Sequence, residues 1–247
     1  MKTYNTIKIL GVDFINGTVD EVISLVKKGG LVVVPSASGL ATIKKDSKYY
    51  EALLSADIVI PDSGYMTLLW YVLRRKKIKR ISGLAFLSNF LNDPEVKASS
   101  DLLLVDPWPV EAKHNLNYLR NSGFNVADDI SYLAPMYDRD RVEDSALLTM
   151  IEMKKPKYVI LNIAGGIEEK LGLYLKKHLS YKPTIICTGA AIAFLTGQQA
   201  RIPNWGDKFF LGWLFRCIQN PKRFIPRYFK TFPLATYIFL YGDHQPL

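Results

Sequence analysis

The sequence predicts an α/β fold, in which a Rossmann-like, mostly parallel sheet carries helices on both faces and a helical, aromatic-basic appendage follows at the C-terminus. Short apolar runs alternate with stretches of helical periodicity along most of the chain. Polar or small residues follow several of these runs, as they do where parallel strands end at a ligand site. The alternation stops near residue 197. We therefore expect a core over residues 1–197 and an appendage over residues 198–247.

The N-terminal part predicts strands around one well-marked helix. Thr18 and Glu21 have the spacing of a capping box, and the apolar residues after them recur with a helical period as far as Gly29. A continuous apolar run over 31–34 is typical of a strand buried on both faces. The expected order is strands over 7–10 and 12–15, the helix, the strand over 31–34, helical structure up to residue 54 and a strand over 58–60.

The same alternation continues to residue 195. Strands are expected over 101–105, 124–127, 158–162 and 184–187, and helices over 110–120, 144–153, 168–177 and 189–195. No apolar stretch approaches the ~20 residues of a membrane-spanning helix, and the longest, 233–241, is about half that length. A chain of this kind that meets a membrane is expected to lie on its surface.

Composition and charge narrow the classes of partner. The chain of 247 residues is 49% hydrophobic and 22% charged, which supports a large core and argues against disorder. Its net charge of +9 favours an anionic partner, which is a membrane, a nucleic acid or a phosphorylated substrate. Cys187 and Cys217 lie in apolar sequence, and the N-terminus lacks the pattern of a secretory signal. We therefore expect a cytoplasmic protein without a disulfide framework.

Small and polar residues follow the predicted strands at the points where a ligand would bind. Because the carboxyl ends of parallel strands meet at one edge of a sheet, we expect these residues to border one cleft. They are Ser36 and Ser38 after 31–34, Asp62 after 58–60, Glu168 and Glu169 after 158–162, and Gly189 after 184–187.

Asp62 has two interpretations that the sequence leaves open. Its carboxylate is placed to act as a general base toward a sugar hydroxyl, but an aspartate before a helix is also a common N-cap. Glu168 and Glu169 likewise suit either a site or the first turn of a helix, where the helix dipole favours acids. Gly189 allows a phosphate to approach a helix N-terminus. The sequence shows no metal-ligand spacing among its histidines, and the DxD-like 138–140 lies in a solvated charge run.

The C-terminal segment over 202–241 mixes aromatic and basic residues with few acids. Such a mixture suits a surface that meets lipid and phosphate together, because aromatic rings sit at headgroup depth and cations meet anionic headgroups. Nucleic-acid binding is a weaker interpretation, because the cations cluster near large apolar groups and not along a polar groove. The aromatic residues include Trp205, Phe209, Phe210, Trp213, Phe215, Phe224, Tyr228, Phe229 and Phe232.

Several short motifs in order along the chain resemble the WecG/TagA/CpsF glycosyltransferases. They include Pro61-Asp62 and Arg80-Ile81-Ser82-Gly83, then Arg201-Ile202-Pro203, Trp213-Leu214-Phe215-Arg216, Pro221-Lys222-Arg223 and Arg227-Tyr228. The resemblance covers nearly the whole chain, and its C-terminal block is the most specific part. It implies a peripheral enzyme on the inner face of a bacterial cell membrane, in surface polysaccharide biosynthesis.

The resemblance also implies a reaction. Such enzymes are inverting and metal-independent, use no cofactor, and move N-acetylmannosamine, its uronic acid or a hexose from a UDP-sugar to a sugar on polyprenyl pyrophosphate. Asp62 is then the base, and the cationic site residues offset charge on the leaving UDP or hold the acceptor pyrophosphate. These residues are Arg80, Arg216, Arg223 and Arg227.

The chain departs from the family pattern at the donor pocket. A threonine and an asparagine of the family fall on Val34 and Ser36, and a glutamine falls on Glu168. A glycine-rich turn is replaced by Asp106-Pro107-Trp108-Pro109. These changes keep a second interpretation open, in which the chain is a catalytically degenerate homologue that acts as a binding or scaffold protein of polysaccharide assembly. The donor sugar, the acceptor and homo-oligomer formation are left open.

Overall fold

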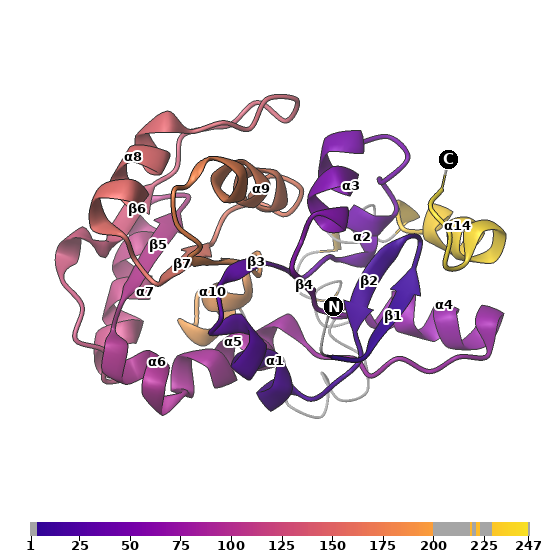
Figure 1. Ribbon diagram of the computed structural model, residues 1–247, viewed down its shortest axis with the longest axis horizontal. Helices are drawn as coiled ribbons and strands as arrows, with labels where there is room; N and C mark the ends of the chain where they lie inside the picture. The colour runs from indigo at the N-terminus through magenta and orange to yellow at the C-terminus, as the bar shows by residue number, and fades with distance from the viewer. Residues whose placement is uncertain (1–3, 200–217, 219–220, 223–228, 247) are drawn as a thin grey trace.

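The described part of the chain forms an eight-stranded sheet with the strand order β1-β2-β4-β3-β8-β7-β5-β6 (Figure 1). The structure is a computed structural model, and it describes residues 4–199, 218, 221–222 and 229–246. All neighbouring strands run parallel except the hairpin of β1 and β2 at one edge. The predicted α/β class with a mostly parallel sheet is confirmed. The strands are β1 (Thr6–Ile9), β2 (Val12–Ile15), β3 (Gly30–Val33), β4 (Ile58–Val59), β5 (Leu102–Asp106), β6 (Ser131–Leu133), β7 (Tyr158–Leu161) and β8 (Thr184–Cys187).

Helices cover both faces of the sheet, because each strand sends alternate side chains to opposite sides. One cluster of buried side chains lies beneath α3, α4, α8, α9 and α14, and the other lies beneath α1, α5, α6, α7 and α10. Val32 and Val33 illustrate the alternation, since they belong to different clusters. The described helices are α1 (Val19–Val26), α2 (Ala37–Leu40), α3 (Ser47–Leu54), α4 (Gly64–Arg74), α5 (Gly83–Asn92), α6 (Pro94–Ser99), α7 (Pro109–Asn121), the 3-10 turn η1 (Asp128–Ile130), α8 (Ser145–Lys154), α9 (Glu168–His178), α10 (Ala191–Leu195) and α14 (Pro233–Tyr241).

Local signals account for most of these elements. The Thr18 side chain accepts from the Glu21 backbone and the Glu21 side chain accepts from the Thr18 backbone, so the capping box begins α1 as predicted. Gly11 has a φ of +77° at the turn between β1 and β2, a conformation that favours glycine. The expected helical structure up to residue 54 divides into α2 and α3, because the Asp46 side chain starts a new helix by accepting from the Tyr49 N–H.

One predicted strand is wrong. Residues 124–127 form no strand, and the position beside β5 is taken instead by β6. Phe124 and Val126 are buried in the cluster that lies beneath α1, α5, α6, α7 and α10. The alternation of buried and exposed residues over 124–127 therefore reflects side-chain packing without a strand partner. The Asn125 N–H donates to the Ser100 hydroxyl at 3.0 Å, which is a loop contact. An alternating pattern indicates burial on one side, and only the neighbouring chain decides whether a ladder forms.

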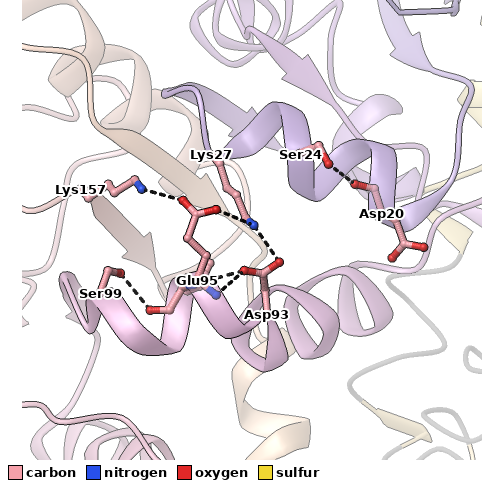
Figure 2. A network of polar contacts seen from close by, with 8 residues as sticks. Asp20, Ser24, Lys27, Asp93, Glu95, Ser99 and Lys157 are labelled. Atoms are coloured by element: carbon pink, nitrogen blue, oxygen red, sulfur yellow. Dashed lines mark hydrogen bonds and ion pairs between the residues drawn. The ribbon is translucent and has the colours of Figure 1, made fainter.

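Ion pairs join the helices at the amino edge of the sheet, where the strands begin. Lys27 follows α1, and its Nζ lies 2.8 Å from Asp93 and 3.0 Å from Glu95 of α6 (Figure 2). Lys157, just before β7, lies 3.2 Å from the other Glu95 oxygen. The contacts tie two helices of the same layer to the start of a central strand.

The last helix packs into the core. Leu234 and Ile238 of α14 are fully buried in the same cluster as α4, and Figure 1 shows the two helices at the same end of the molecule. The Arg74 guanidinium donates to the Ile238 and Phe239 carbonyls at 3.0 and 2.9 Å, which satisfies the end of α14. The Leu10 N–H donates to the Gly242 carbonyl at 2.8 Å. The division at 197/198 stays a prediction, although this part of the predicted appendage is anchored on the core.

Within residues 4–199 and 229–246, every helix falls short of the length and hydrophobicity that a membrane-spanning segment needs.

Candidate active site

The carboxyl edge of the sheet brings most of the predicted site residues into one region. Strands β4, β3, β8 and β7 are consecutive neighbours, and the predicted residues stand in the loops or helix starts that follow them. Since adjacent strands lie about 4.8 Å apart, the ends of β4 and β8 are separated by roughly 10 Å. A single cleft bordered by all of these residues stays a prediction.

Asp62 and Arg80 lie side by side at the end of β4. An Arg80 Nη2 is 3.6 Å from the Asp62 carboxylate, and the Arg80 Nε donates to the Asp62 carbonyl at 2.6 Å. The Gly83 N–H, at the start of α5, donates to Asp62 Oδ1 at 3.0 Å. The positive end of the α5 dipole and the guanidinium therefore both face this carboxylate. Two motifs that are separate in sequence, Pro61-Asp62 and Arg80–Gly83, form one unit.

Gly83 suits this unit because a side chain there would be tightly packed. A Cβ on Gly83 would lie 3.1 Å from Val34 Cγ1 and 3.9 Å from the Asp62 carboxyl carbon. The backbone of α5 thereby approaches the carboxylate closely enough to donate a hydrogen bond.

Asp62 is not the N-cap of the helix that follows it. That position belongs to Ser63, whose hydroxyl accepts from the Met66 N–H at 3.1 Å. The capping interpretation of Asp62 for α4 is therefore wrong. Its side chain is 34% exposed, and no described residue donates to Oδ2. One carboxylate oxygen is thus fixed by the Gly83 N–H, and the other has no donor among the described residues.

Ser36 and Ser38 stand after β3 and contact each other. Their hydroxyl oxygens are 3.0 Å apart, and Ser36 also accepts from the Gly39 N–H at 3.2 Å as the N-cap of the short helix α2. Both are half-buried. The capping bond accounts for Ser36 in structural terms, and substrate binding by either hydroxyl stays a prediction.

Glu168 and Glu169 form the first turn of α9, and both carboxylates are bound to backbone N–H groups. Glu168 Oε2 accepts from the Gly189 N–H at 2.8 Å, and Glu169 Oε2 accepts from the Gly166 N–H at 2.6 Å. Each residue is only 2% exposed. The Gly189 N–H is therefore occupied, and α10 begins two residues later, at Ala191. The predicted helix start at 189 is corrected by two residues, because Gly189 has a φ of +59°.

Burial raises the pKa of this carboxylate pair. Loss of solvent is the main cause for both residues, and repulsion from Glu169 raises the pKa of Glu168 further. The pKa of Glu169 rises to about 7, because burial outweighs the backbone hydrogen bonds that favour its charged form. The buried Tyr49 hydroxyl and Cys187 thiol face the same pair, and their pKa values are raised by burial first and then by the carboxylates.

Sequence reasoning gave no role to Asp106, which ends β5 at the same edge. Its carboxylate is fully buried and accepts from the amides of Asn115 and Asn162 at 2.7 and 2.8 Å and from the Ser131 hydroxyl at 2.8 Å. Burial raises the pKa of Asp106 despite these donors. An acid that ends an apolar strand is the signal that could have identified it. The network fixes the loops after β5 and β7.

The remaining predicted residues concern the appendage and metals. Arg216, Arg223 and Arg227 lie outside the described residues. Within the described ranges, no group of three or more histidine, cysteine, aspartate or glutamate side chains is arranged to hold a metal ion.

Comparison with known proteins identifies the family. The model of the Glycosyl transferase WecG/TagA/CpsF family matches residues 7–244. The chain belongs to this family. It is also 23% identical over 192 residues to the N-acetylglucosaminyldiphosphoundecaprenol N-acetyl-beta-D-mannosaminyltransferase of Bacillus subtilis (strain 168), a match that spans 76% of this chain and 72% of that protein. The resemblance seen in the sequence motifs is confirmed, and the protein is a glycosyltransferase of the WecG/TagA type.

Proposed function

We propose that this glycosyltransferase moves a sugar from a UDP-sugar to a sugar on polyprenyl pyrophosphate, with inversion at the anomeric carbon and without a metal ion, in bacterial surface polysaccharide biosynthesis. The observation that carries the proposal is the Asp62 carboxylate, with one oxygen held by the Gly83 N–H and the other without a donor among the described residues. The name of the Bacillus subtilis relative, which describes transfer of N-acetylmannosamine to a diphosphoundecaprenol-linked sugar, supports the class of acceptor.

The proposed step is a single displacement. Asp62 Oδ2 removes the proton from an acceptor hydroxyl, and the resulting oxygen attacks the anomeric carbon as the bond to the UDP oxygen breaks. The electron pair of that bond leaves with UDP, and attack from the opposite face inverts the anomeric configuration. Arg80 offsets charge near the reacting groups, since its guanidinium lies 3.6 Å from Asp62.

The other predicted site residues have auxiliary roles in the proposal. Ser36, Ser38, Glu168, Glu169 and Gly189 border the donor side of the site. Arg216, Arg223 and Arg227 bind the pyrophosphate of the donor or the acceptor, a bidentate task that suits guanidinium groups. N-acetylmannosamine, its uronic acid and a hexose are the candidate donor sugars. The protein works on the cytoplasmic surface of the membrane, where a lipid-linked acceptor is found.

A transfer assay tests the proposal. The full-length protein is incubated with each candidate UDP-sugar and a short-chain polyprenyl-pyrophosphate acceptor, in the presence and absence of EDTA. The expected product is one glycosylated acceptor of inverted configuration, formed at equal rates with and without EDTA. Transfer that stops in EDTA and returns with a divalent ion contradicts the metal-independent step.

A scaffold or binding role is the second candidate, and one observation favours it. The Glu168 carboxylate occupies the Gly189 N–H, a group that would otherwise be available to a phosphate. UDP-sugar binding by calorimetry without turnover of any donor supports the scaffold role, and turnover contradicts it.

A further inference from the structure

Two neighbouring helices present apolar side chains to solvent at one end of the molecule. Leu68, Tyr71 and Val72 of α4 are 58%, 43% and 50% exposed, and Phe239 and Leu240 of α14 are 66% and 61% exposed. The spacing in α4 is i, i+3, i+4, so the three side chains lie on one outward face. The helices pack against each other through the Arg74 contacts to the end of α14. We refer to this surface as the α4–α14 face.

The composition of the two helices differs from that of an ordinary surface helix. No charged residue occurs in α4 before Arg74, and none occurs in α14. A surface helix of a globular domain normally places charged or polar residues on its outer side. Apolar patches of this kind on a soluble protein mark contacts with a partner or a membrane.

Cations stand at the borders of the face. Arg75, Lys76 and Lys77 follow α4 directly and are exposed, and the Lys77 ammonium lies 5.5 Å from the centre of the Tyr71 ring. Beside α14, the exposed Lys44 donates to the Tyr241 hydroxyl at 2.9 Å. This surface is complementary to a lipid bilayer. Its apolar side chains and tyrosines match the boundary between headgroups and acyl chains, and its flanking cations match anionic headgroups.

We propose that the α4–α14 face contacts the surface of an anionic lipid bilayer, so that helix α4 of the core, and not the C-terminal segment over 202–241 alone, binds the membrane. The position of α4 gives this contact a consequence for the site. Ser63 caps α4 and Asp62 immediately precedes it, so the helix that lies on the lipid begins at the proposed base. Over its length of 11 residues, α4 extends about 16 Å from that point. Membrane contact thereby fixes the carboxyl edge at a set height above the lipid, within reach of a lipid-linked acceptor.

The inference rests on the proposed function only in assuming a lipid-linked acceptor. The contact between the α4–α14 face and lipid can be tested without that assumption. The test uses the full-length protein in vesicle flotation, with phosphatidylcholine alone and with phosphatidylcholine mixed with phosphatidylglycerol. The double variant Leu68→Gln/Val72→Gln is expected to lower partitioning onto both vesicles by at least about tenfold, because each side chain loses its burial in lipid. The control is Val110→Gln on α7, where the valine is 64% exposed on another surface. This control is expected to bind as the wild type does.

A charge variant gives an independent readout. Lys76→Gln/Lys77→Gln is expected to weaken binding to the anionic vesicles by about fivefold per lysine and to leave binding to neutral vesicles unchanged. Lys113→Gln, an exposed lysine of α7, is its control. Thermal unfolding of each variant confirms that the fold is retained.

Two results would overturn the inference. One is wild-type flotation of Leu68→Gln/Val72→Gln. The other is a sedimentation mass of this variant that falls from dimer to monomer, which would identify the face as an interface between two copies of the chain. Transfer to a soluble acceptor analogue should be equal in the wild type and Leu68→Gln/Val72→Gln. A wild-type protein that floats but transfers no sugar contradicts the proposed function and leaves the membrane contact intact.

Discussion

The acidic residues at the two edges of the sheet have different partners. At the amino edge, Asp57, Asp93 and Glu95 each pair with lysines, and Asp57 lies 2.7 Å from Lys176. At the carboxyl edge, Glu168, Glu169 and Asp106 are buried and bind only neutral donors among the described residues. Asp62, beside Arg80, is the half-buried exception at that edge.

The pKa directions follow from this difference. Burial opposes ionisation of Asp57 and Asp93, but their lysine partners and backbone donors outweigh it and lower the pKa of both. The hydrogen bond from Lys27 is the first cause of the lowered pKa of Glu95. Burial raises the pKa of Glu168, Glu169 and Asp106. The amino edge thus stabilises the fold through charge pairs, whereas the carboxyl edge holds carboxyl groups at a cost in stability, as functional sites commonly do.

The largest expected effect is at Asp62. Asp62→Asn keeps the shape of the side chain and removes the base, so turnover should fall by about 10²–10⁴-fold. Steady-state kinetics with the donor and acceptor found by the transfer assay measures the loss. The amino-edge variant Asp57→Asn is the control and should retain wild-type turnover. Unchanged turnover in Asp62→Asn would exclude Asp62 as the base, and unfolding of that variant would show a structural role.

The second prediction concerns the pH dependence of stability. Since the pKa of Glu169 is raised from 4.5 to about 7, the folded state binds more protons than the unfolded state between these values. The contribution of Glu169 is therefore fully present below about pH 4.5 and is lost as the pH rises to about 7, and it is on the order of 3 kcal/mol. Glu169→Gln keeps an acceptor for the Gly166 N–H and should flatten this part of the profile. Urea unfolding between pH 4 and 8 measures the free energy of unfolding of both proteins. If its pH dependence is the same in Glu169→Gln and the wild type, Glu169 is not the group responsible.

The third prediction concerns Asp57, which is paired with a lysine at the amino edge. Asp57 accepts from the Leu31 N–H at 2.8 Å and pairs with Lys176. Asp57→Asn should lower the free energy of unfolding at pH 7 by about 1–3 kcal/mol, because a partly buried lysine loses its partner. Its pKa is lowered, so this stability is present above the unfolded-state value and is lost as the pH falls toward acid. Urea unfolding should show a smaller loss from pH 7 to pH 3 in the variant than in the wild type.

The smallest expected effect is at Lys27. Lys27→Met removes the contacts to Asp93 and Glu95, which are partly solvent-screened, and should lower the unfolding free energy by less than about 1 kcal/mol. Thermal unfolding at low and high salt measures it, because the difference from wild type should shrink as salt rises. A loss that is independent of salt would show that packing of the lysine stem, and not charge, is responsible.

The sequence by itself predicted most of the elements and named the candidate residues. Periodicity predicted the strands and helices because side-chain spacing repeats within one element, and the capping box fixed the start of α1. The position of Asp62 after an apolar strand was sufficient to place it at the carboxyl edge of the sheet, because parallel strands present their carboxyl ends together. The motif order was sufficient to predict the family, which residues 7–244 confirm.

Only the tertiary structure decided which partners those residues meet. The Gly83 N–H contacts Asp62 because α5 returns to the end of β4, and Glu168, after β7, turns inward to the Gly189 N–H, after the neighbouring strand β8. Residues 124–127 lost their predicted strand because β6 occupies the neighbouring position, and α14 joined the core through Arg74. Each of these outcomes depends on contacts between segments far apart in the chain. Local periodicity reports which side of an element is buried, but the strand order and the helix that covers it depend on the packing of the whole domain.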